Sequence, residues 1–308
     1  TQGGDDATVF EFGFEVDVCV DGQWTHHRRN IDERKSALVV HTGSRPTALV
    51  IDPDFTVTAP IKLTGPADIL RNSLREAPTA RGRAAAANAL RRRPDPLSIT
   101  ALEQCLGREN EAWMVRAEAA SALSAISGDA ARDALLAAQS TTHPKVRRAI
   151  VAALGEFRGE AVATALATLA SKDESYLVSA AAARSLGKTK AENAPEKLRP
   201  LLKKNSWADV IRAGALEGLA ASGNDEVTDD LISWSKYGRP LRARRAAIAA
   251  LGRVGEGRKV REHLVELLRD RDPHLRVAVL GALEGLGDPK ARGAIHSITS
   301  KELDGRVQ

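Results

Sequence analysis

Aromatic residues and methionine are scarce in this chain. Only 4% of its 308 residues are aromatic, and it has one Met. The core must therefore be built mainly from Ala, Leu and Val, a composition that suits closely packed helices. With 43% apolar and 28% charged residues, the chain is typical of globular protein and long enough for one large or two ordinary domains.

Cysteines and long apolar runs are also lacking. The two cysteines, Cys19 and Cys105, are too few for a disulfide framework or a thiolate metal site, so the redox compartment and the cellular location stay open. No apolar run reaches the ~18 residues that a membrane-spanning helix needs. The chain starts at Thr1 rather than Met and shows no signal peptide, so we expect it to be processed or cut from a longer protein.

The motifs of common catalytic sites are absent. No two of the seven histidines stand four residues apart, which excludes the H-E-x-x-H zinc helix, and no G-x-S-x-G, phosphate-binding glycine loop or Cys-x-x-Cys occurs. His26 and His27 are adjacent in an expected strand, so they point to opposite faces and cannot easily share a metal ion. His41 offers no evident third ligand, and we interpret His263 as a surface or packing residue. We expect no catalytic, cofactor or metal site in this chain.

The first 65 residues have the pattern of β-strands. Apolar side chains occupy every second position from Phe10 to Val20, Asp21-Gly22 is a turn signal, and residues 23–31 form the expected hairpin partner. Two further short strands, 37–40 and 48–51, are joined by a turn at 43–46. These four strands predict part of an antiparallel β-sandwich over residues 1–65, with the even-numbered apolar face inside.

From residue 66 onward the chain consists of a repeat of about 32 residues. The repeating segments are GRAAAANAL (82–90), VRAEAASAL (115–123), VRRAIVAAL (146–154), VSAAAARSL (178–186), IRAGALEGL (211–219), ARRAAIAAL (243–251) and LRVAVLGAL (275–283), which start 33, 31, 32, 33, 32 and 32 residues apart. The ninth residue is always Leu and the eighth is always small. Small residues let neighbouring helices approach closely, so this position predicts a contact between helices.

Each repeating segment follows a second amphipathic helix, and breakers such as His143-Pro144 and Asp272-Pro273 separate the two. Such a two-helix unit with the pattern V-R-x-x-A-x-x-A-L resembles the HEAT-like repeats named after the bilin lyases. Seven units cover 66 to about 287, and a last helix follows. The predicted fold class is mainly α: a HEAT-like α-solenoid over 66–308 preceded by the small antiparallel β segment. In such solenoids the second helices usually line the concave side.

Arginine recurs at the second position of the repeating segment, and Ser179 is the one exception. The recurring arginines are Arg83, Arg116, Arg147, Arg212, Arg244 and Arg276. Their position borders the core, so we expect each stem to pack while the head pairs with an acid or carbonyl of the next repeat. Positions that point away from the core carry Arg148, Arg184, Glu217 and Arg245, which are our candidate contacts on the concave face.

Positive charge is concentrated in the repeats. Residues 1–80 hold 8 Lys/Arg and 12 Asp/Glu, whereas residues 81–308 hold 37 and 28. Basic helical solenoids include the alkylpurine DNA glycosylases, so a nucleic-acid partner must be weighed. About six of these charges belong to the recurring arginines, however, and aromatic side chains for stacking on bases are few. The sequence therefore disfavours a nucleic-acid partner.

Three stretches of the β segment are similar to M1-family zinc aminopeptidases. Thr1-Gln2 resembles the end of the family's Q-T-Q strand, residues 12–16 resemble its F-x-x-P-x-x-V/I strand, and Asp52-Pro53 resembles the D-P close of its sandwich. Gly13 stands where the family commonly has Pro, and the expected Leu-Lys after Asp-Pro is only loosely matched by Ile61-Lys62.

In that family a catalytic thermolysin-like domain is followed by a small β-sandwich and a helical domain, which some bacterial members build from HEAT repeats. The resemblance implies that this chain begins within the sandwich and that the zinc site lies upstream of Thr1. It implies the non-catalytic C-terminal region of a metallopeptidase, with its own catalytic domain or a peptide substrate as partner. Non-catalytic relatives among transcription-factor subunits leave the activity of the parent open. The alternatives are a freestanding HEAT scaffold for protein partners and, less favoured, a nucleic-acid binder.

Overall fold

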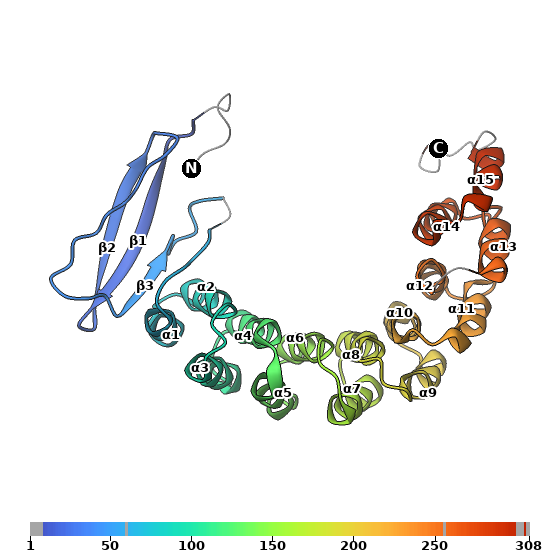
Figure 1. The fold of residues 1–308 in the computed structure, drawn as a ribbon, viewed down its shortest axis with the longest axis horizontal. Coiled ribbons are helices and arrows are strands. Elements are labelled where there is room, and N and C mark those ends of the chain that lie inside the picture. Colours follow the sequence, from blue (N-terminus) through green and yellow to red (C-terminus); the bar gives the residue numbers. More distant parts are fainter. Residues whose placement is uncertain (1–8, 59–60, 255–256, 300–304, 306–308) are drawn as a thin grey trace. The chain divides into compact units, whose positions relative to one another are not determined.

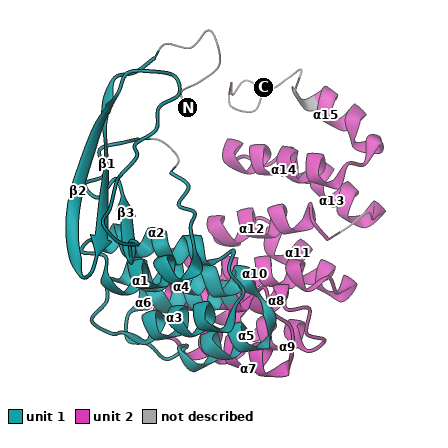
Figure 2. Cartoon of the chain, turned by 60° about the vertical axis from the view of Figure 1, so that its left-hand side comes forward, with its two compact units in different colours: residues 1–153 teal, residues 154–308 magenta. Residues whose placement is uncertain are grey.

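The computed structural model describes residues 9–58, 61–254, 257–299 and 305. Strands precede helices along the chain (Figure 1), and the change falls near the expected position because α1 begins at Ala67. The chain divides into two compact units, residues 1–153 and 154–308, which Figure 2 colours separately. The division into a β domain of 1–65 and a helical domain of 66–308 stays a prediction, since the sheet and the first helices share one unit.

Unit 1 contains a three-stranded sheet and three helix pairs. Its elements are β1 (Phe12–Val20), β2 (Gln23–Ile31), β3 (Ala48–Ile51), α1 (Ala67–Glu76), α2 (Ala80–Leu90), α3 (Pro96–Gly107), α4 (Trp113–Ile126), α5 (Gly128–Ala137) and α6 (Pro144–Leu154).

Unit 2 contains the remaining helix pairs and the last helix. Its elements are α7 (Glu160–Lys172), α8 (Tyr176–Lys188), α9 (Ala194–Leu198) with the 3₁₀ turn η1 (Arg199–Lys203), η2 (Trp207–Asp209), α10 (Val210–Ser222), η3 (Asp225–Val227), α11 (Thr228–Ser235), α12 (Leu241–Leu251), α13 (Arg258–Leu267), α14 (Pro273–Leu286), η4 (Pro289–Ala291) and α15 (Arg292–Thr299).

The sheet has the antiparallel order β2-β1-β3, and the predicted hairpin is confirmed. Asp21 and Gly22 form its turn with φ angles of 49° and 79°, the left-handed geometry that a two-residue hairpin requires. The predicted strand at residues 37–40 is wrong. Residues 37–40 pair with no strand, and the carbonyl of Ala37 accepts a hydrogen bond from the Arg29 side chain of β2.

The predicted sandwich is also wrong, because helices rather than strands cover the sheet. The face that packs on α1 and α2 carries Cys19, Ala48 and Val50, all at most 1% exposed. The even-numbered face, expected inside, is only partly covered, and Phe10 at its end is 68% exposed. Alternation alone could not settle which face is buried, since the helices that cover the sheet lie far along the chain.

The predicted helix pairs follow from residue 67 to 286, and each second helix packs on the next one within its unit. In unit 2, α8, α10, α12 and α14 form one layer, and α7, α9, α11 and α13 form the other (Figure 1). The recurring ninth-position leucines are the centre of this core, with exposures of 0 to 3%. They are Leu90, Leu123, Leu154, Leu186, Leu219, Leu251 and Leu283.

The backbones of α8 and α10 approach most closely at small residues. A Cβ added at Gly218 would lie 2.3 Å from the carbonyl oxygen of Ala183, and one at Gly187 would lie 1.9 Å from that of Gly218. These contacts involve rigid helix backbone, so an added methyl group cannot be accommodated by a side-chain rotation. The small eighth residue of the repeat is thus a spacing requirement.

We predict that Gly218→Ala lowers the free energy of unfolding by about 1–3 kcal/mol, because the helices must move apart. Gly281→Ala is the matched control in α14, where an added Cβ meets nothing within 4 Å. That change should be neutral or stabilise by about 0.5–1 kcal/mol through helix propensity. Urea unfolding followed by circular dichroism measures both, and equal effects of the two changes would contradict the spacing requirement.

Candidate functional site

The recurring arginines bond to backbone carbonyls at the end of the first helix of their own repeat or in the turn that follows it. In three repeats the Nε atom donates: Arg116 to Leu106 O (2.9 Å), Arg212 to Leu202 O (2.9 Å) and Arg244 to Ser235 O (3.0 Å). In three others Nη1 donates: Arg83 to Ala77 O (2.7 Å), Arg147 to Thr141 O (3.0 Å) and Arg276 to Asp270 O (2.8 Å). The last carbonyls of a helix lack partners within it, so these arginines act as caps.

Several of these arginines also reach a carboxylate of the following repeat. Arg83 binds Glu111 through two hydrogen bonds of 2.8 and 2.9 Å, and Arg244 forms an ion pair with Asp270. The predicted pairing with an acid of the next repeat is confirmed for Arg83 and Arg244. Arg116 and Arg212 instead pair with Glu109 and Asp209 of their own repeats, and the carbonyls also belong to the same repeat. Hydrogen bonds from Arg116, and further ones from Thr142 and Thr141, lower the pKa of Glu109 to about 2. Glu109 lies in the turn of the same repeat as Arg116.

In α8, Ser179 stands at the position of the arginine and makes part of the same contact with backbone carbonyls. Its hydroxyl donates to Leu169 O at 3.4 Å and to Asp173 O at 3.3 Å, the positions that arginines cap elsewhere. The exception to the sequence pattern therefore preserves the same contact with a shorter side chain.

The four predicted contact residues differ in their surroundings. Arg148 on α6 in unit 1 and Arg245 on α12 in unit 2 are exposed. Arg184 on α8 and Glu217 on α10 form an ion pair between neighbouring second helices, so each neutralises the other. Their role in binding a partner stays a prediction.

We predict that Arg244→Ala costs about 3 kcal/mol or more of unfolding free energy. Arg244 is 5% exposed, and its removal leaves Asp270 and the carbonyl of Ser235 buried without their partner. The adjacent exposed Arg245 is the control, and Arg245→Ala should change the stability by no more than ~0.5 kcal/mol. Chemical denaturation of both variants measures the difference. Similar losses would show that the two neighbouring positions on α12 do not face different environments.

The two histidines of β2 have different hydrogen-bond partners. His26 Nδ1 lies 2.8 Å from Asp17 Oδ1 across the hairpin, and this hydrogen bond raises the pKa of His26. His27 Nε2 lies 2.9 Å from the hydroxyl of Thr25, on the opposite face of the strand. Among the described residues no three His, Cys, Asp or Glu side chains are grouped as metal ligands, so the donor set there does not fit a zinc ion.

A serine–histidine pair in unit 2 was missed by the sequence patterns. Ser235 Oγ lies 2.7 Å from His263 Nε2, and it also lies 2.8 Å from the carbonyl of Ile232. Ser235 is fully buried, and burial lowers the pKa of His263. A hydroxyl that no substrate can reach is a packing contact between α11 and α13, and only the spacing of about one repeat could have hinted at it.

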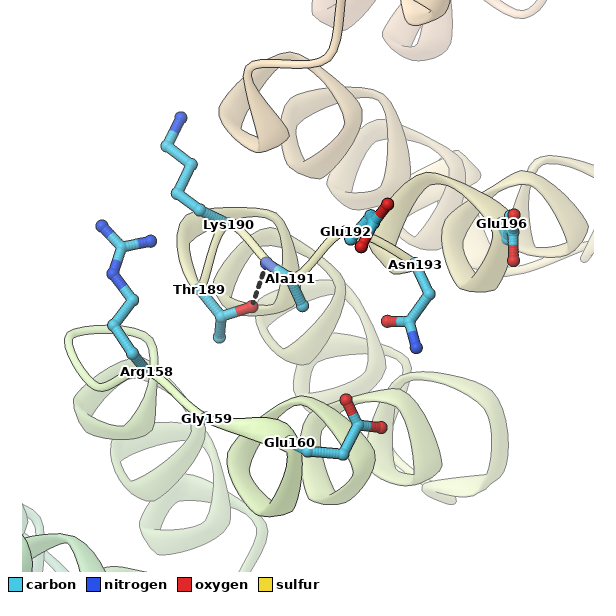
Figure 3. Close-up of a pocket in the computed structure, with 9 residues that line it drawn as sticks. All are labelled: Arg158, Gly159, Glu160, Thr189, Lys190, Ala191, Glu192, Asn193 and Glu196. Atoms are coloured by element: carbon cyan, nitrogen blue, oxygen red, sulfur yellow. Dashed lines mark hydrogen bonds between the residues drawn. The ribbon is translucent and has the colours of Figure 1, made fainter.

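A pocket of ≈ 670 Å³ lies in unit 2 at the start of α7 and the link from α8 to α9 (Figure 3). The Glu160 carboxylate accepts hydrogen bonds from Thr164 (3.1 Å) and Lys197 (3.4 Å), which lower its pKa. Arg158 donates to the carbonyl of Lys188 at 3.0 Å, and Asn193 Oδ1 is buried without a hydrogen-bond partner. The nine lining residues hold no serine, cysteine or histidine.

Two further features bear on chemistry. Burial raises the pKa of the Cys105 thiol to about 11, and Cys19 is also buried, so both thiols are poor nucleophiles. Of the helices that the structure describes, none has the length and apolar character needed to cross a bilayer.

A family model of HEAT repeats matches residues 67–142, 135–220 and 228–308. This chain belongs to the HEAT-repeat family. The comparison with curated sequences yields no match.

Solved structures with similar helices share 18–20% sequence identity with this HEAT-repeat chain. They include the complex of CpcE and CpcF of phycocyanin lyase from Nostoc sp. PCC7120 (18% identity, 80% of this chain and 97% of the other, TM-score 0.48). Human deoxyhypusine hydroxylase is also similar (18% identity, 72% and 85% covered, TM-score 0.36), as is an engineered protein (20% identity, 75% and 70% covered, TM-score 0.38).

Proposed function

We propose that this HEAT-repeat chain is a non-catalytic scaffold that binds protein partners through its layer of second helices. The observation that carries the proposal is the division of adjacent arginines into two classes. Arg147 and Arg244 are used by the fold, whereas Arg148 and Arg245 project from the same helices into solvent among alanines. The fold does not need these two charged side chains. On the surface of a repeat protein, such side chains are suited to binding another macromolecule.

The test compares complexes captured from the source organism on the purified full chain. We expect Arg148→Glu with Arg245→Glu to lose partners that the wild-type chain retains, because the charge reversal repels a complementary acidic surface. The control reverses two exposed arginines on first helices, Arg75 on α1 and Arg258 on α13. Retention of the same partners by both double variants would contradict a binding role for the second-helix layer.

A second candidate function is the non-catalytic C-terminal region of an M1-like zinc aminopeptidase. It is supported by the β1–β2 hairpin and by the turn at Asp52-Pro53, where the buried Asp52 carboxylate accepts hydrogen bonds from Thr56 N (2.8 Å) and Val57 N (3.3 Å). The Thr1-Gln2 part of that resemblance lies outside the described residues. In this case the partner is the chain's own upstream catalytic domain or its peptide substrate, and zinc is bound there.

The reading frame upstream of Thr1 separates the two candidates. An encoded H-E-x-x-H followed by a downstream Glu supports the peptidase region, and a frame without it leaves the scaffold alone.

A further inference from the structure

Unit 2 keeps large aromatic side chains at the surface of its turns. Trp207 is 71% exposed and Tyr237 is 79% exposed, each in the turn between the two helices of its repeat. The chain has only four Trp and two Tyr, and its core consists of Ala, Leu and Val. Tryptophan and tyrosine are the residues most enriched at the energetic centre of protein interfaces, so their placement here calls for a partner.

The turn that holds Trp207 outward is strained. Ala208 and Asp209 have φ angles of 47° and 54°, a left-handed conformation that costs non-glycine residues about 1–3 kcal/mol each. The turn is held by the hydrogen bond from Ile211 N to Ser206 Oγ (3.1 Å) and by the ion pair between Asp209 and Arg212. Backbone strain thus occurs at the two residues that follow the exposed Trp207.

Arginines lie over the aromatic rings of this region. The guanidinium carbon of Arg242 is 5.9 Å from the centroid of the Trp207 ring, and that of Arg239 is 4.5 Å from the ring of Trp234. Leu241, between the two arginines, is 49% exposed. We call this surface the aromatic–arginine edge: Trp207, Trp234, Tyr237, Arg239, Leu241 and Arg242.

The charge around this edge is mainly positive. The segments 203–209 and 236–242 hold five basic residues, Lys203, Lys204, Lys236, Arg239 and Arg242, and a single acid, Asp209. Asp209 is already paired with Arg212, and the neighbouring Asp270 is paired with Arg244. These two carboxylates are therefore already paired with arginines, and the excess of basic residues leaves the edge complementary to an anion.

We propose that the aromatic–arginine edge binds an acidic segment of a partner protein in which Asp or Glu alternates with apolar side chains. A guanidinium that lies over an aromatic ring is held in one orientation. Its N–H groups can still donate two hydrogen bonds to a carboxylate. Trp207, Tyr237 and Leu241 supply apolar contact for the side chains between the acids. A protein segment fits better than single-stranded nucleic acid, because Arg239 lies over the ring of Trp234, a face on which a base would stack. The inference rests on the proposed scaffold function but assigns a different surface and the chemistry of its ligand.

The test measures binding of a short fluorescein-labelled peptide, with Asp and Glu alternating with Phe and Leu, to the purified full chain by fluorescence anisotropy. We expect Trp207→Ala, Tyr237→Ala and Arg242→Glu each to weaken binding by about tenfold or more, as loss of a central interface residue does. Arg253→Glu is the control, since it makes the same charge change at an exposed position just beyond the opposite end of α12, and it should weaken binding by less than about twofold. The changed residues are exposed, so circular dichroism should show that the variants fold.

Two further ligands complete the experiment. A peptide with Asn and Gln in place of the acids should bind about tenfold more weakly, because the charge-assisted hydrogen bonds are lost. Equal losses with Arg242→Glu and Arg253→Glu would overturn the proposal in favour of unspecific attraction. Absence of binding by the acidic peptide would also overturn it, as would tighter binding of an oligothymidylate that depends on Trp207 and Arg242. Trp207→Ala separates the two proposals, because it should lose the acidic peptide and keep the partners that depend on Arg148 and Arg245.

Discussion

The close approach of neighbouring second helices is the contact on which the helical part of each unit depends. A two-helix repeat cannot bury its apolar side alone, so its stability comes from the interface with the next repeat. In unit 2 this interface brings the backbone at Gly218 against the carbonyl of Ala183, while leucines such as Leu186 and Leu219 fill the space beside it. Because both the small residue and the leucine must recur at fixed places, the interface imposes the repeat on the sequence.

The same packing creates a problem that the recurring arginines solve. Helices that end at a turn leave carbonyl groups without partners, and burial makes such groups costly. Arg116, which is 1% exposed, donates to Leu106 O and to the Glu109 carboxylate, so its charge is compensated and a carbonyl is capped at once. The arginines of the repeat are consequently buried or half-buried and used by the fold, and the basic composition of the chain overstates the positive charge that its surface offers.

Periodic, local features could be predicted from the sequence, and features set by distant contacts could not. The helix pairs, the buried leucines such as Leu123 and the exposure of Arg148 follow from the repeat and from helix geometry. The buried face of the sheet depends on α1 and α2, and the segment 37–40 is held by a side-chain hydrogen bond from Arg29 to the carbonyl of Ala37 that no alternation of residues reveals. The contact between Ser235 and His263 likewise joins two repeats and leaves no periodic mark.

The turns are the part of this fold in which packing constrains the sequence least. Residues within the helix pairs are constrained by stacking at almost every position, so substitution there is limited by packing. None of the residues in the turn from 203 to 209 is fully buried, and the turn carries a strained backbone and the exposed Trp207. Strain and exposed aromatic area both oppose stability, so neither is explained by folding. Within unit 2 the most informative residues about function are therefore those that break the repeat, since the residues that obey it are already explained by the stacking they maintain.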